Sequence, residues 1–181
     1  SPTSPLGLKS NTTPQGTVLE PINPISVTLG IRNASFVAQA VDWIPELVHD
    51  IVDAAFQHKG LSFVRVLQRC PEYLDGRYDA WVKDPGKMLL LNHENGIQTS
   101  PALASVYKNH EIHDPADRNR AREIASTSDP IPVGVLYRNQ SIPCYENPRG
   151  PDRLYTPDVV KGVLEKELDR FTIQAVGGGG D

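Results

Sequence analysis

Two short apolar runs flank one strongly amphipathic helix pattern, and this arrangement constrains the fold more than any other feature of the chain. The runs are Ser35 to Val41 (SFVAQAV) and Leu61 to Cys70 (LSFVRVLQRC). Between them, apolar residues recur every three or four positions, as on one face of an α-helix, at Ile44, Leu47, Val48, Ile51, Val52 and Ala55. A strand, a helix and a strand at this spacing predict a β-α-β crossover with parallel neighbouring strands, and so an α/β fold.

The second apolar run ends in a cysteine, Cys70, and Pro71 follows it at once. A short β-branched run behind a glycine favours a buried strand of an α/β sheet, and the strand ends of such sheets face the ligand crevice. A thiol held there is well placed to bind a ligand. A free cysteine is also among the most buried residue types, and one thiol makes no metal site by itself. On the residues alone, the packing role is favoured over the binding role.

Capping residues predict where two of the helices begin. Asp42 is expected to cap the helix after the first strand, with Pro45 tolerated in its first turn. Asp114 and Pro115 are expected to open a later helix. The exposed side of that helix holds three arginines, Arg118, Arg120 and Arg122. We expect this side to be a solvated face, and the alternative is a docking patch for an acidic electron carrier.

We expect four parts along the chain. Residues 1–24, rich in Pro, Ser, Thr, Asn and Gly, predict an extended loop that either links segments or wraps a ligand or a partner. Residues 25–140 are expected to form the α/β core. Residues 141–173 are expected to form a C-terminal extension with a helix that starts at Pro157, and residues 174–181 a disordered tail.

Composition and motifs argue against several function classes. A net charge of −4 without a basic stripe disfavours nucleic-acid binding, and no apolar run approaches the ~20 residues of a membrane span. Two cysteines are too few for a disulfide scaffold, which favours a reducing cytoplasm. No Walker loop, GxSxG elbow, HExxH or CxxC motif is present. His110 and His113 stand three apart, but Pro115 places His113 at a helix start rather than in a metal pair.

Several stretches, taken in order, resemble one known family. They are the opening SPTSPLGLKSNTTPQGTVLEPINP, the SFVAQAV strand and the helix after it, the LSFVRVLQRC strand, HDPADRNRA, and IPVGVLY with the later Tyr145-Glu146. The chain up to about Phe171 resembles the C-terminal part of the β subunit of thiamine-diphosphate-dependent 2-oxoacid:ferredoxin oxidoreductases. The resemblance implies a thiamine-diphosphate-type fold, with a parallel sheet flanked by helices and long Pro-rich loops. Residues 1–24 would then follow the cofactor loop.

The resemblance implies an enzyme portion that is not active alone. The family oxidatively decarboxylates a 2-oxoacid on thiamine diphosphate with magnesium, passes electrons through a 4Fe–4S cluster to ferredoxin, and yields an acyl-CoA. The implied partners are an α subunit, the N-terminal half of the β subunit, ferredoxin, the 2-oxoacid and coenzyme A. The opening loop favours 2-oxoglutarate as the substrate, with pyruvate next.

The same resemblance implies a metal-binding role for Cys70. Family members with a cluster in the β subunit take three cysteine ligands from the N-terminal half and a fourth from the end of a late strand, which Cys70 matches. A cluster needs four thiolates, and they need not be neighbours in sequence. The family's GDG motif, its magnesium-binding asparagine, its lysine-bearing loop and its first three cysteines have no match in this chain. Thr3 and Ser4 are expected to lie beside the cofactor loop.

Two other hypotheses stay open on the sequence. One is a non-catalytic interaction subunit, in which the Pro-rich loop and the Trp81 region dock on a partner and Cys70 is merely buried. The other is a fragment of a thiamine-dependent carboligase or decarboxylase that has no metal cluster. A colourless complex that is inert toward 2-oxoacids would favour the first, and non-redox product formation would favour the second.

Overall fold

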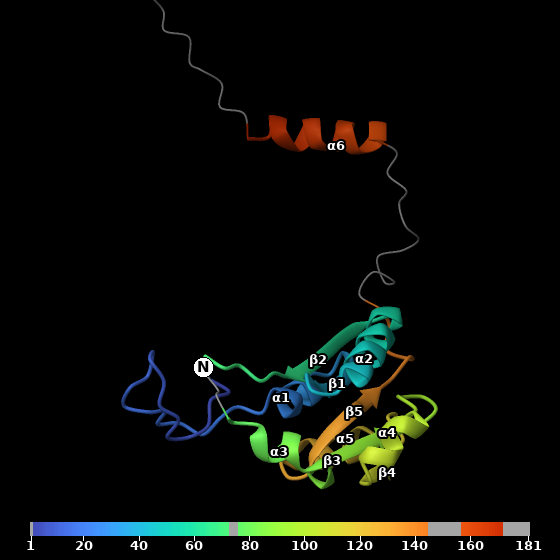
Figure 1. The fold of residues 1–181 in the computed structure, drawn as a ribbon. Helices are drawn as coiled ribbons and strands as arrows, with labels where there is room; N and C mark the ends of the chain where they lie inside the picture. The colour runs from blue at the N-terminus through green and yellow to red at the C-terminus, as the bar shows by residue number, and fades with distance from the viewer. Residues whose placement is uncertain (1, 73–75, 145–156, 172–181) are drawn as a thin grey trace, which may run out of the picture. The chain divides into compact units, whose positions relative to one another are not determined.

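The computed structural model describes residues 2–72, 76–144 and 157–171, and the chain divides into two compact units, Ser1–Cys144 and Tyr145–Asp181. The described part of the first unit contains a five-stranded sheet with the order β2-β1-β5-β3-β4 (Figure 1). The strands are β1 (Ala34–Val41), β2 (Leu61–Leu67), β3 (Met88–Asn92), β4 (His110–Ile112) and β5 (Ile131–Arg138). The predicted α/β class is therefore confirmed.

The directions of the strands are mixed. Strands β1 and β2 are parallel neighbours joined by helix α2 (Pro45–Gln57), as the periodicity predicts. Strand β5 is antiparallel to β1 but parallel to β3, and β3 is parallel to β4. The resemblance had implied a parallel sheet, and the antiparallel β1–β5 pair corrects this expectation. Strand direction depends on the end of the sheet at which the chain re-enters it, and the local apolar pattern carries no information on that end.

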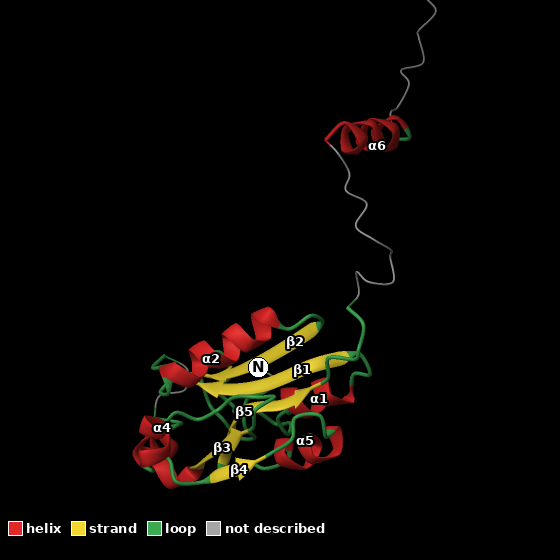
Figure 2. Cartoon of the chain, turned by 90° about the vertical axis from the view of Figure 1, so that its right-hand side faces the viewer, coloured by secondary structure: helices red, strands yellow, loops and turns green. Residues whose placement is uncertain are grey.

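Helices cover both faces of β1, whose residues are all buried. Besides α2, the helices of the first unit are α1 (Pro24–Gly30), α3 (Asp79–Lys83), the 3-10 helix η1 (Pro85–Lys87), α4 (Pro101–Val106) and α5 (Arg118–Ala125). Phe36 on one face of β1 packs in the same core cluster as Leu47 and Ile51 of α2. Val37 on the other face packs in a second cluster with α1 and α5, which lie beside each other (Figure 2). The core therefore has two layers, one on each side of β1.

Strand β2 is an edge strand rather than the buried strand that its apolar composition favours. Leu67 is its only buried residue, and Leu61 and Val66 are 51% and 43% exposed. An apolar run is buried only where other elements cover it, and among the described residues β1 is its only paired neighbour. Cys70 is not part of the strand either, since β2 ends at Leu67 and the half-buried Cys70 lies three residues further on.

Both predicted helix caps are wrong, by two residues for α2 and by three for α5. Helix α2 has Ile44 at its N-cap, while the Asp42 carboxylate accepts hydrogen bonds from the backbone and side chain of Arg69 at 3.0 Å each. Helix α5 is capped by Asp117, whereas Asp114 accepts a bond from the backbone of Ala116 in the preceding turn. Aspartate favours caps and short turns alike, so its presence near a helix start does not select between them.

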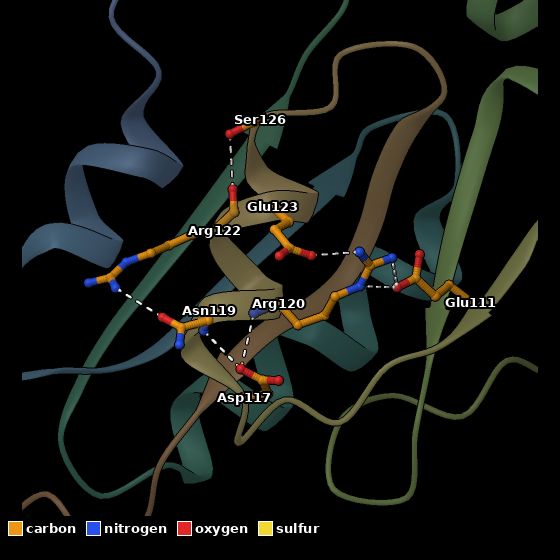
Figure 3. Close-up of polar contacts among 7 residues, drawn as sticks. All are labelled: Glu111, Asp117, Asn119, Arg120, Arg122, Glu123 and Ser126. Atoms are coloured by element: carbon orange, nitrogen blue, oxygen red, sulfur yellow. Dashed lines mark hydrogen bonds and ion pairs between the residues drawn. The ribbon is translucent and has the colours of Figure 1, made fainter.

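The arginines of α5 bind other groups within the chain, and Arg120 and Arg122 are at the same time exposed, as the expected solvated face requires. Arg118 donates to the carbonyls of Ile31, Arg32 and Ala34, just after α1, and its guanidinium lies 4.4 Å from the ring centroid of Tyr137. Figure 3 shows partners of the other two: Arg120 pairs with Glu111 and Glu123, and Arg122 donates to Asn119. Because all three guanidinium groups are engaged within the chain, the docking alternative has no set of unpaired charges at these positions.

Replacing Arg118 with lysine is expected to lower the free energy of unfolding by about 1.5–3 kcal/mol, because a lysine ammonium cannot reproduce a planar fork that binds several carbonyls. Urea denaturation followed by tryptophan fluorescence measures this loss. The matched control is Arg120→Lys, whose exposed ion pairs contribute little in water, so its denaturation midpoint should stay unchanged. Equal midpoints for both variants would show that the carbonyl contacts of Arg118 do not hold α1 in place.

In the second unit, the described residues form helix α6 (Pro157–Asp169) and the turn after it. The predicted start at Pro157 is confirmed, whereas the tail at 174–181 lies outside the described residues. Large apolar side chains of this helix and of the turn after it are exposed, among them Val160, Val163, Leu164, Leu168 and Phe171.

The two spaced histidines have separate roles. His113 is 2% exposed, and its Nε2 donates to the carbonyl of Leu136 in β5, so it is a core residue rather than the helix-start residue expected. His110 is exposed on β4. The described residues contain no group of three or more His, Cys, Asp or Glu side chains that could hold a metal ion.

Candidate functional site

A hollow of about 710 Å³ opens where β2 ends, beside the N-terminal loop. Phe63, Arg65 and Leu67 line it from β2. The N-terminal loop and the segment after β2 supply mostly polar groups, among them Thr3, Ser4, Thr12, Gln68, Cys70 and Tyr78. The hollow thus lies at the carboxyl end of β2, the region where α/β sheets bind their ligands.

A second hollow of about 320 Å³ shares part of this lining. Arg65, Arg77 and Tyr78 line both spaces, and the second one extends to Gln39 of β1 and to Pro132 at the start of β5. Because β5 runs antiparallel to β1, its first residues lie at the same edge of the sheet as the end of β1. Strand β5, whose antiparallel direction sequence patterns did not predict, therefore supplies part of the site.

The N-terminal loop is held in place by its own hydrogen bonds. Asn23 caps α1 through its side-chain oxygen and donates from Nδ2 to the carbonyl of Ala125 at the end of α5. Within the loop, the Gly7 amide donates to the carbonyl of Thr17 at 2.7 Å. These bonds anchor the loop where it turns into α1, so that its polar side chains form one wall of the larger hollow.

Arg65 is the charged residue that the sheet places most directly at the site. It lies opposite Gln39 in the β1–β2 register, and its Nη1 donates to Gln39 Oε1 at 3.3 Å. Gln39 in turn donates from Nε2 to the carbonyl of Pro132 at 2.7 Å. Burial lowers the pKa of Arg65, although the residue remains a cation at neutral pH. The site therefore contains a half-buried positive charge, the Arg65 guanidinium, which the side-chain amide of Gln39 holds by a hydrogen bond.

Cys70 and the two residues expected near the cofactor line the same hollow. Thr3 and Ser4, at the far end of the sequence, line the larger hollow together with the half-buried Cys70. Cys70 therefore borders an open space rather than lying enclosed in the core, a position that is accessible to a metal ion. Cys144 lines neither hollow. A four-thiolate cluster at Cys70 would need ligands from outside the described residues.

Sequence reasoning missed three polar residues of the site, Gln39, Arg65 and Arg77. A signal for two of them was present: Gln39 and Arg65 each interrupt an apolar strand at its centre, where an unexplained polar residue suggests a function. Arg77 gave no comparable signal, because it follows β2 in a polar segment.

A mixed α/β sheet with a hollow at a strand end is the arrangement in which α/β domains commonly bind ligands. Comparison with known proteins narrows this class. The family model for the C-terminal part of the pyruvate ferredoxin oxidoreductase beta subunit matches residues 103–150. The chain is 28% identical over 177 residues to the 2-oxoacid:ferredoxin oxidoreductase subunit beta of a Sulfolobus species, covering 96% of this chain and 54% of that protein.

One further relative and one solved structure are also similar to this chain. The 2-oxoglutarate oxidoreductase subunit KorB of Mycobacterium tuberculosis is 36% identical over 96 residues, which are 53% of this chain and 26% of that protein. The fold resembles a 2-oxoglutarate:ferredoxin oxidoreductase from Magnetococcus marinus, solved with 2-oxoglutarate, coenzyme A and succinyl-CoA bound, with a TM-score of 0.57 and 23% identity over 98% of this chain and 48% of that one.

The chain is thus similar, over most of its length, to β subunits of 2-oxoacid:ferredoxin oxidoreductases. It spans about half the length of the Sulfolobus relative, at 54% of that protein. In the part of the chain that the structure describes, no helix combines the length and the apolar character needed to cross a bilayer.

Proposed function

We propose that this chain is part of an enzyme that oxidatively decarboxylates a 2-oxoacid to an acyl-CoA and reduces ferredoxin through a 4Fe–4S cluster, with 2-oxoglutarate preferred over pyruvate. The observation that carries the proposal is that Cys70, Thr3 and Ser4 line one hollow, in a chain similar to 2-oxoacid:ferredoxin oxidoreductase β subunits. The name of the M. tuberculosis relative and the 2-oxoglutarate in the Magnetococcus structure support the choice of substrate.

The chain's own residues have limited roles under this proposal. When bound, thiamine diphosphate with magnesium supplies the carbanion chemistry and the cluster supplies one-electron transfer. Cys70 contributes one thiolate to the cluster from a segment anchored by the Asp42–Arg69 ion pair of 3.0 Å. The polar wall of residues 1–24, with Thr3 and Ser4, faces the same space and is proposed to lie beside the cofactor. The other ligands of both groups come from outside the described residues.

The proposed partners are an α subunit, the N-terminal half of a β subunit, and ferredoxin. Strand β2 supports the proposal that other polypeptides bind this chain. Its outer edge has no partner strand among the described residues, and it exposes Leu61 and Val66. An unpaired edge presents backbone donors and acceptors that another strand can bind. We also propose the division into a loop at 1–24, a core at 25–140 and an extension at 141–173, and a cytoplasmic location, where cysteine thiols stay reduced.

An activity assay on the complete enzyme, assembled from this chain and its partner subunits, tests the proposal. We expect ferredoxin reduction that requires both the 2-oxoacid and coenzyme A, with a higher kcat/KM for 2-oxoglutarate than for pyruvate. Omission of coenzyme A is the control. A complex loaded with iron and thiamine diphosphate that turns over no 2-oxoacid, or that decarboxylates one without transferring electrons, would contradict the proposed function.

A further inference from the structure

Two arginines from different segments converge on the wall that the two hollows share. Arg65 comes from the middle of β2, and Arg77 comes from the segment that leads into α3. Both line the larger and the smaller hollow, together with Tyr78. The same two arginines therefore line both hollows.

Neither arginine is paired with a carboxylate among the described residues, whereas Arg69 pairs with Asp42, and Arg120 with Glu111. Of the described residues that line the two hollows, Asp129 is the one acidic residue. Its carboxylate already lies 3.7 Å from Lys87 Nζ. The space around Arg65 and Arg77 therefore carries an uncompensated positive charge.

The Arg65 side chain is partly buried and is held against the sheet by a hydrogen bond. Its bond to Gln39, itself bonded to the Pro132 carbonyl, fixes one edge of the guanidinium against the sheet. Taking a cation partly out of water without a counter-ion is unfavourable, and burial accordingly lowers the pKa of Arg65. A bound anion would offset this cost, and the planar guanidinium matches the oxygens of carboxylates and phosphates in particular.

We propose that Arg65 and Arg77 together form a binding site for the oxygens of a multiply charged anion, a carboxylate or a phosphate group. The site itself follows from the geometry of this chain. Only the choice of natural ligand rests on the proposed function, which offers two sources of this chemistry: the carboxylates of a dicarboxylic 2-oxoacid and the phosphates of coenzyme A.

Equilibrium binding to the full 181-residue chain tests the site without any need for activity. Sodium pyrophosphate and 2-oxoglutarate serve as separate probes, titrated by calorimetry at constant ionic strength so that screening does not change between samples. Wild type should bind at least one of them. Arg65→Gln and Arg77→Gln should each weaken that binding by about tenfold or more, the effect of losing a charged hydrogen bond.

The matched control is Arg32→Gln, which removes the same charge from an exposed side chain that lines neither hollow. It should bind as wild type does. Arg77→Gln keeps the test valid if Arg65→Gln fails to fold, because Arg77 is exposed. Binding of pyrophosphate alone would assign the site to a phosphate, and binding of 2-oxoglutarate alone to a dicarboxylate.

Three results would overturn the site: no binding of either probe by the wild-type chain, equal binding by wild type and both Arg65→Gln and Arg77→Gln, or an equal loss in Arg32→Gln. These outcomes are independent of the enzyme assay. A chain that binds the probes in a complex that turns over no 2-oxoacid would contradict the proposed function and leave the anion site standing.

Discussion

A Cys70→Ser enzyme is expected to lose its 4Fe–4S cluster and to reduce ferredoxin only at background level. A serine hydroxyl is a poor substitute for the thiolate that iron–sulfur clusters require. The substitution is nearly isosteric, and Cys70 is half-buried at the rim of a hollow, so the chain should still fold. Iron and acid-labile sulfide assays on the assembled enzyme, with electron paramagnetic resonance of the reduced sample, measure the loss directly.

Cys144→Ser is the matched control for this substitution. Cys144 is likewise a half-buried cysteine, but it lines neither hollow, so its serine variant should keep its iron, its sulfide and its activity. Unchanged cluster content in Cys70→Ser would remove the metal-binding role of Cys70. A loss in both variants would point to a general effect of thiol removal rather than to ligation.

Gly134→Ala is expected to destabilise the protein by roughly 3–5 kcal/mol, a large part of the stability of an ordinary domain. Gly134 has φ of +136°, a conformation that residues with a side chain rarely adopt. A Cβ there would lie 2.8 Å from the carbonyl oxygen of Leu91 and 2.9 Å from its Cβ. Both atoms belong to the neighbouring strand β3, so relief would require the two strands to separate.

Urea denaturation of the full chain measures this effect. Gly30→Ala is the control, because Gly30 ends α1 without a positive φ and a Cβ there would meet nothing within 4 Å. Its unfolding free energy should stay within about 0.5 kcal/mol of wild type or rise. A Gly134→Ala protein as stable as wild type would mean that β3 and β5 are less closely packed than the structure has them.

The two substitutions also differ in what the sequence could foresee. The binding role of Cys70 was expected from the resemblance to a family, and the hollow beside it adds a physical setting for that role. Nothing in the sequence singled out Gly134, because a glycine within an apolar run has several possible causes. Its cause is the close approach of Leu91 from another strand.

Local patterns were enough for the β-α-β unit and for the start of α6 at Pro157. Periodicity and the fixed φ of proline act within a few residues, so the signal and the structure occupy the same short segment. The same reasoning was wrong for the caps at Asp42 and Asp114, since the choice between capping and turn roles depends on where neighbouring segments lie.

Long-range packing set the rest: the edge position of β2, the reversed β5, and the partners of the arginines. The Arg65–Gln39 bond joins residues 26 positions apart, and the bond from Arg118 to Ile31 joins residues 87 apart. A local pattern shows that a residue is polar or apolar, but a partner so distant in the chain is chosen by how the layers pack. For this reason the strand that leads to Cys70 could be foreseen, whereas its end at Leu67 and the cationic hollow beside it could not.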